Sequence, residues 1–94
     1  MVGYRLAPEA KADLERIWFY GLENWGLDAA DKYYAAFFHH FKQLAEQPHL
    51  YPAADIREGY RRSVCGSESV YYRVVGEAVE IMAIIGRQEV DDWL

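Results

Sequence analysis

The spacing of apolar residues changes once along the chain, and that change limits the class of fold. Before Pro48, apolar side chains recur at intervals of three and four residues, which predicts amphipathic helices. After Gly59 they alternate with other residues over short runs, which predicts β-strands. A chain with helices first and strands afterwards favours an α+β fold, in which the helices cover one face of an antiparallel sheet.

The first half of the chain predicts two helices joined as an antiparallel hairpin. Pro8 suits the first position of a helix, and Gly26 is placed to end that helix. Asp28 is expected to begin the second helix and Pro48 to stop it. Because the connection is short, the helices should run antiparallel. Their apolar stripes are Leu14, Ile17, Trp18, Gly21, Leu22 and Trp25 in the first helix, and Tyr33, Tyr34, Phe37, Phe38, Phe41, Leu44 and Ala45 in the second.

Strands are expected at residues 2–6, 60–65, 69–75 and 78–85, with hairpin turns at 66–67 and 76–77. At a length of 94 residues the chain can close one core, so residues 1–94 are expected to form a single domain. The expected fold is therefore a short N-terminal strand and an antiparallel helix hairpin packed on a mainly antiparallel, three- to four-stranded sheet. The tail, residues 86–94, is expected to add at most a short turn or helix. Alternation predicts that one sheet face carries Val70, Tyr72 and Val74, and that one face of the last strand carries Val79, Ile81, Ala83 and Ile85.

Composition excludes several classes of protein. A hydrophobic content of 52% excludes a disordered chain, and no apolar run approaches the roughly 20 residues that span a bilayer. The net charge of −5 makes direct binding to nucleic-acid phosphates a poor expectation. Cys65 is the sole cysteine, so no internal disulfide can form, which fits a reducing cytoplasm. We therefore expect a soluble cytoplasmic domain with no membrane segment.

Metal and cofactor chemistry has little support in the sequence. His39 and His40 are adjacent on a helix and point about 100° apart, so they cannot share an ion. His49 has no cysteine or carboxylate at ligand spacing, and Cys65 is expected to be a buried, inert thiol. We expect no metal, no cofactor and no catalytic residue.

The arginines of the C-terminal half are more informative, because this half contains no lysine. Arg61, Arg62 and Arg73 fall in neighbouring strands and can converge on one side of the sheet, with Arg87 just after the last strand. The guanidinium fork suits carboxylates and phosphates. Three interpretations stay open: pairing on a solvated face, docking of an acidic partner peptide, and binding of RNA phosphates. The paired acids would be Asp55, Glu68, Glu80 or Asp91, and the aromatic residues that could cover a partner are Trp25, Tyr33, Tyr60 and Trp93.

Three short stretches together resemble one superfamily of toxins. The first is Leu-Ala-Pro-Glu-Ala at residues 6–10, continuing to Asp13-Leu14 and Ile17-Trp18. The second is Gly-Tyr-Arg-Arg at 59–62 followed by Val-Tyr-Tyr-Arg-Val at 70–74, and the third is Val-Glu-Ile at 79–81 leading to Ile-Ile-Gly-Arg-Gln at 84–88. In this order they resemble the RelE/ParE toxins of type II toxin–antitoxin systems over nearly the whole chain. The resemblance implies the RelE/ParE-like fold.

Within that superfamily the chain is more similar to ParE than to RelE. RelE-like ribonucleases carry a catalytic arginine where this chain has Ser69, and often a C-terminal Tyr or His, whereas this tail ends Asp-Trp-Leu. A net charge of −5 also fits ribosomal RNA poorly. The resemblance to ParE implies a non-enzymatic toxin that inhibits DNA gyrase by protein–protein contact. It also implies a ParD-like antitoxin, whose C-terminal segment folds along the toxin as a helix and in some cases adds a strand.

The resemblance also implies where those contacts lie. Contacts with target or antitoxin are expected at Arg61, Arg62, Arg73, Arg87 and Trp93. The alternative is a ribosome-dependent mRNA endoribonuclease of the RelE type, in which Arg62, Arg73 and Arg87 take the place of the missing catalytic set.

Overall fold

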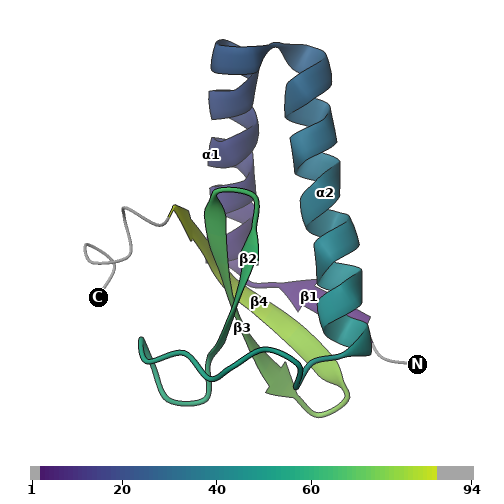
Figure 1. Cartoon of the computed structure of the whole chain (residues 1–94), viewed down its shortest axis with the longest axis vertical. Coiled ribbons are helices and arrows are strands. Elements are labelled where there is room, and N and C mark those ends of the chain that lie inside the picture. Colours follow the sequence, from purple (N-terminus) through teal and green to yellow (C-terminus); the bar gives the residue numbers. More distant parts are fainter. Residues whose placement is uncertain (1–2, 87–94) are drawn as a thin grey trace.

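Two helices cover one face of a four-stranded sheet in the computed structural model, which describes residues 3–86 (Figure 1). The sheet order is β1-β4-β3-β2, with β1 parallel to β4 and the other neighbours antiparallel. The predicted α+β fold is thus confirmed, whereas the predicted turn or helix after Gly86 lies outside the described residues. The elements in chain order are β1 (Gly3–Leu6), α1 (Pro8–Trp25), α2 (Leu27–Glu46), β2 (Arg61–Cys65), β3 (Glu68–Val75) and β4 (Ala78–Gly86).

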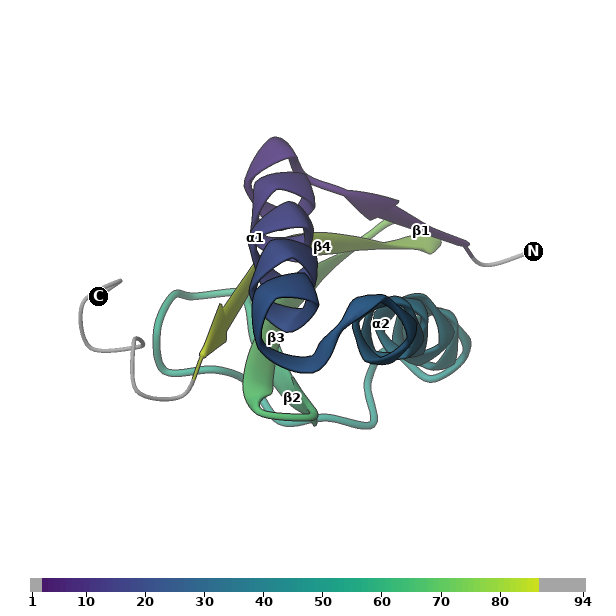
Figure 2. The same cartoon turned by 90° about the horizontal axis from the view of Figure 1, so that it is seen from above.

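Gly26 alone joins the two helices. Its φ of +92° is a conformation that favours glycine, and its N–H donates to the carbonyl of Leu22 to close α1. Gly26 also precedes Leu27, the first residue of α2. This helix therefore begins one residue before the predicted Asp28, and no side chain caps it. The helices therefore run antiparallel, as predicted, with α1 packed against β4 (Figure 2). Among residues 3–86, neither helix is long and apolar enough to cross a membrane.

The main core lies between the helices and the sheet. It confirms most of the predicted helical stripes, but Trp18 is only half-buried and Trp25 is 53% exposed. The reason is the length of the hairpin, because the joined ends of α1 and α2 extend beyond the sheet (Figure 1). The buried residues of this core are Ala10, Leu14, Ile17, Phe37, Phe41, Leu44, Val70, Tyr72, Val79, Ile81 and Ile84.

A β-bulge in β4 corrects the predicted faces of that strand. Tyr71 pairs with Ala83 but Tyr72 pairs with Ile81, which leaves Met82 as an extra residue. The alternation therefore changes phase. Ala83 and Ile85 face away from the helices, so the prediction that they share a face with Val79 and Ile81 is wrong. On the far face they form a second cluster with Tyr71, packed against Ala54, Ile56 and Tyr60.

Side chains of α1 complete the outer edge of β4. Strand β1 pairs with β4 only as far as Ile81. Beyond it, Asp13 Oδ2 accepts a hydrogen bond from the Ile84 N–H at 2.9 Å, and Arg16 donates to the Ile84 carbonyl at 3.0 Å. A helix thus takes the place of a further strand at the backbone N–H and C=O of Ile84, whose burial without partners would be costly.

We expect Asp13→Ala to lower the free energy of unfolding by about 1–3 kcal/mol, because the Ile84 N–H loses its acceptor. Asp13→Asn keeps an amide oxygen as acceptor and should lose less. Urea unfolding of both variants measures this, with Glu15→Ala on the exposed side of α1 as control. A loss in Asp13→Ala no larger than that in the control would contradict the role of Asp13.

Stability should also depend on pH through His40. Its Nε2 lies 2.5 Å from Ser63 Oγ in the packed contact between α2 and β2, and burial lowers the pKa of His40 below 6.5. The unfolded chain therefore binds a proton before the folded protein does, so stability should fall as the pH drops below about 6.5 towards the folded pKa. Urea midpoints between pH 7.5 and 5 should show a steeper loss for the wild type and His39→Gln than for His40→Gln. Equal pH slopes in the wild type, His39→Gln and His40→Gln would show that His40 does not cause the loss of stability.

Candidate protein-binding surfaces

The sheet face opposite the helices carries a row of charged side chains. The register places Arg5, Glu80 and Arg73 side by side across β1, β4 and β3. Arg73 Nη2 lies 2.7 Å from Glu80 Oε1, and Arg5 Nε lies 3.4 Å from Glu80 Oε2. The hydrogen bond from Arg73 lowers the pKa of Glu80, so the carboxylate stays charged and the row keeps an excess positive charge.

Arg62 adds a third cation to the same face. It pairs with Tyr71, and its Nε donates to Ser69 Oγ at 3.1 Å while the residue stays exposed. We call Arg5, Arg62, Arg73 and Glu80 the arginine face. Part of this side of the sheet is covered by the segment before β2, including Tyr60, which packs against the cluster of this face.

The structure separates Arg61 from Arg62 and Arg73. Arg61 pairs with Tyr72 and so lies on the helix side of the sheet, where it donates to the carbonyl of Tyr51. It holds the connection between α2 and β2. Arg87 and Trp93 lie outside the described residues. Sequence reasoning missed Arg5, because only the parallel pairing of β1 with β4 brings this residue beside Glu80.

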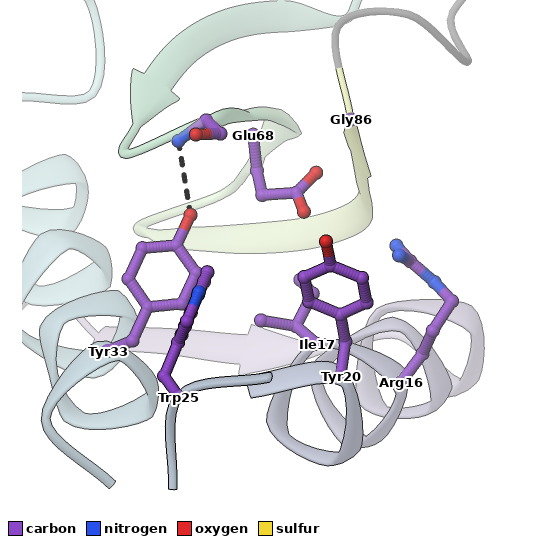
Figure 3. Close-up of a pocket in the computed structure, with 8 residues that line it drawn as sticks. Arg16, Ile17, Tyr20, Trp25, Tyr33, Glu68 and Gly86 are labelled. Atoms are coloured by element: carbon purple, nitrogen blue, oxygen red, sulfur yellow. Dashed lines mark hydrogen bonds between the residues drawn. The ribbon is translucent and has the colours of Figure 1, made fainter. Parts of the chain in front are cut away.

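A second candidate surface is a pocket between the helix hairpin and the turn that joins β2 to β3 (Figure 3). Its volume is about 370 Å³. Tyr20 and Trp25 on its wall are 59% and 53% exposed, a large apolar area to leave in water. We call it the aromatic pocket, lined by Arg16, Ile17, Tyr20, Trp25, Tyr33, Ser67, Glu68 and Gly86.

Tyr33 fixes the wall of the aromatic pocket to the sheet. Its hydroxyl accepts a hydrogen bond from the Ser67 N–H at 3.1 Å, and burial raises the pKa of this hydroxyl, which therefore stays protonated. Gly66 has φ +61°, and a Cβ at this position would lie 2.4 Å from the Tyr33 oxygen. Only glycine allows the turn to approach α2 so closely.

The groups most suited to covalent or proton-transfer chemistry are His40 and Cys65, which are buried and partly buried respectively. His40 is buried against Ser63, and burial raises the pKa of the Cys65 thiol, which disfavours the nucleophilic thiolate. Among the residues described, no group of three His, Cys, Asp or Glu side chains could hold a metal ion. The open surfaces therefore present arginines and aromatic rings, which are typical of protein contacts.

Comparison with known families identifies the kind of protein that carries these surfaces. Residues 4–91 match the family described as the ParE toxin of type II toxin-antitoxin system, parDE. The chain belongs to the ParE toxin family. Toxin ParE1 of Caulobacter vibrioides is 41% identical over 86 residues, which cover 90% of this chain and 88% of that toxin. Toxin ParE1 of Mycobacterium tuberculosis is 37% identical over 91 residues, which cover 94% and 93% of the two chains.

Solved structures agree on the fold of this ParE-family chain. A chain from the chromosomal ParDE TA system of P. aeruginosa matches with a TM-score of 0.77 at 23% identity, over 92% of this chain and 96% of that one. A chain from the toxin-antitoxin complex RelBE2 of Mycobacterium tuberculosis matches with a TM-score of 0.66 at 21% identity, covering 90% and 96%. The RelE/ParE-like fold expected from the sequence is thus confirmed.

We expect Gly66→Ala to destabilise the protein more than Gly76→Ala does. Both glycines have φ +61°, so both variants lose about 1–2 kcal/mol through backbone strain. A Cβ at position 76 meets nothing within 4 Å, whereas one at position 66 meets the Tyr33 ring. The difference between the two urea unfolding free energies measures the contact, and equal losses would show that Tyr33 does not hold the turn.

Proposed function

We propose that the chain is a toxin that inhibits DNA gyrase by protein–protein contact and is neutralised by a ParD-like antitoxin. The observation that carries the proposal is the arginine face, a set of exposed arginines on the sheet surface opposite the helices whose positions are set by backbone register. Rigid guanidinium forks on such a surface suit carboxylates of a protein partner. Family membership supports the toxin assignment, and the ParDE title of a similar structure supports an antitoxin partner.

The residues proposed to contact target or antitoxin are Arg62, Arg73, Arg87 and Trp93. Arg61 contributes indirectly, because its side chain holds the carbonyl of Tyr51 on the helix side of the sheet. The Glu80 carboxylate orients Arg73 and leaves the face positively charged. A partner segment with acidic residues therefore meets fixed cations, which favours correct docking over nonspecific association.

Binding without catalysis is the proposed mode of action. A net charge of −5 opposes binding to ribosomal RNA, which depends on many phosphate contacts. Ser69, at the position of a catalytic arginine in the nuclease branch, accepts a hydrogen bond from Arg62 and is buried. Binding to a protein target does not require a positive net charge on the whole chain. The RelE-type ribonuclease is therefore the alternative that the experiment must exclude.

A DNA supercoiling and cleavage assay with purified gyrase tests the proposal. The chain should inhibit supercoiling and trap cleaved DNA, and a ParD-like antitoxin should relieve both effects. Cleavage of mRNA on programmed ribosomes with no effect on gyrase would contradict the proposal and establish the alternative.

We expect the double variant Arg62→Ala/Arg73→Ala to raise the toxin concentration for half-maximal gyrase inhibition by about tenfold or more, since charge-assisted contacts at an interface are lost. The matched control is Lys11→Ala, which removes an exposed cation from α1 on the other side of the molecule. Equal inhibition by the double variant and the control would show that the arginine face does not contact gyrase. Circular dichroism should confirm that both variants are folded.

A further inference from the structure

We propose that Arg5 and Arg73 together bind carboxylates of an acidic protein segment, and that Glu80 is the positioning residue that holds the two guanidinium groups in place for it. This inference deepens the proposed function and rests on it for the identity of the protein that supplies the segment. It adds Arg5 to the contact residues and gives the Glu80 carboxylate a role in binding.

Backbone pairing holds the three side chains in one row. Arg5 of β1 pairs with Glu80 of β4, and Glu80 also pairs with Arg73 of β3. Because β4 lies between β1 and β3, Glu80 has one arginine on each side (Figure 1). Neighbouring strands are spaced so that the backbones of the two arginines lie roughly 10 Å apart. Their side chains bridge this gap by converging on the carboxylate, with Nε of Arg5 3.4 Å from Oε2 and Nη2 of Arg73 2.7 Å from Oε1.

Both arginines keep donors for a partner. Glu80 receives Nε and Nη2 of Arg73, and Nε of Arg5. A guanidinium carries five N–H groups, so these contacts use only part of each fork. The side chains of Arg5 and Arg73 are 57% and 45% exposed, whereas that of Glu80 is only 16% exposed. A partner that reaches the row therefore meets guanidinium groups rather than the carboxylate.

The charge of the row favours an anionic partner. Two guanidinium groups share one carboxylate, which leaves one excess positive charge. The hydrogen bond from Arg73 lowers the pKa of Glu80, so this balance holds at neutral pH. Guanidinium forks donate charge-assisted hydrogen bonds to carboxylates. Because the chain's net charge of −5 opposes binding to nucleic acid, the favoured ligand is an acidic segment of a protein.

Small residues beside the row leave room for a partner chain. The next row on the same face contains Gly3, Ala78 and Val75. A Cβ at Gly3 would meet nothing within 4 Å, so the space beside Arg5 is open. The segment before β2 packs instead on the second cluster, further along β3 and β4. A partner backbone can therefore approach the row from the side of Gly3.

Loss of the Glu80 carboxylate would have two opposed effects on binding. It would make the face more positive, which strengthens the attraction to an acidic segment. It would also free two long side chains, whose rotamer entropy must then be lost on binding. If Glu80 acts by positioning, the second effect is larger. The sign of the change in Glu80→Gln therefore separates positioning from net charge.

An NMR titration of the free chain tests the proposal. The probe is a capped tetraglutamate peptide, and capped tetraglutamine is the matched control, since it has the same length and no charge. The Nε–H signals of Arg5 and Arg73 should shift saturably with a Kd in the millimolar range, and tetraglutamine should bind about tenfold more weakly or not at all. The Trp18 indole, which donates to Asp31, is the internal control and should not shift.

Variants test the two roles separately. Arg5→Ala and Glu80→Gln should each weaken tetraglutamate binding about threefold or more. Lys42→Ala and Glu23→Gln make similar charge changes at exposed positions of α2 and α1 and should not weaken it. In free Glu80→Gln, the Nε–H signals of both arginines should also move towards those of a solvated arginine. A general loss of stability would not produce this signature in a folded variant.

Several outcomes would overturn the proposal. They are unchanged or tighter binding by Glu80→Gln, unchanged binding by Arg5→Ala, and no saturable shift with tetraglutamate. Tighter binding of an equally charged thymidine oligonucleotide would also overturn it, since the face would then prefer phosphates. Because the titration contains neither gyrase nor antitoxin, its failure leaves the proposed function intact, and failure of the gyrase assay leaves this result intact.

Discussion

The hydrogen bonds from α1 to the backbone of Ile84 determine how the two layers fit together. Asp13 and Arg16 satisfy the N–H and C=O of this residue where β1 no longer pairs with β4. This contact fixes α1 along the outer part of β4, so the last turn of the helix projects beyond the sheet (Figure 1). The aromatic pocket is a consequence of that projection. The opposite sheet face receives no helix. The segment before β2 covers part of it, and the exposed remainder carries the arginine face.

Local features of the fold could be predicted, because they depend on neighbouring residues. The helices, their hairpin and the turns follow from apolar spacing, Gly26 and Pro48. The bulge at Met82 could not be predicted, since an apolar run does not reveal which residue is extra. The exposure of Trp25 could not be predicted either. Its helical spacing matches a buried stripe, but its exposure depends on where the sheet ends.

The candidate site was only partly predictable for the same reason. Alternation predicts that Arg62 and Arg73 lie in neighbouring strands, and the structure places both on one face of the sheet. Alternation could not place Arg5, because nothing in residues 2–6 indicates which strand is its neighbour. It also left the side of Arg61 open, and register with Tyr72 puts that residue on the helix side. Contacts between distant segments therefore decide which arginines act together.

A chemical footprint checks the claim that the arginine face contacts gyrase. The free chain and the chain bound to purified gyrase are treated with an arginine-specific dicarbonyl reagent, and modification of each arginine is measured by mass spectrometry. We expect Arg62 and Arg73 to be protected in the complex, while the reactivity of Arg61, on the helix side of the sheet, stays the same in the free and bound chain. Equal modification of Arg62 and Arg73 in the free and bound chain would contradict the claim.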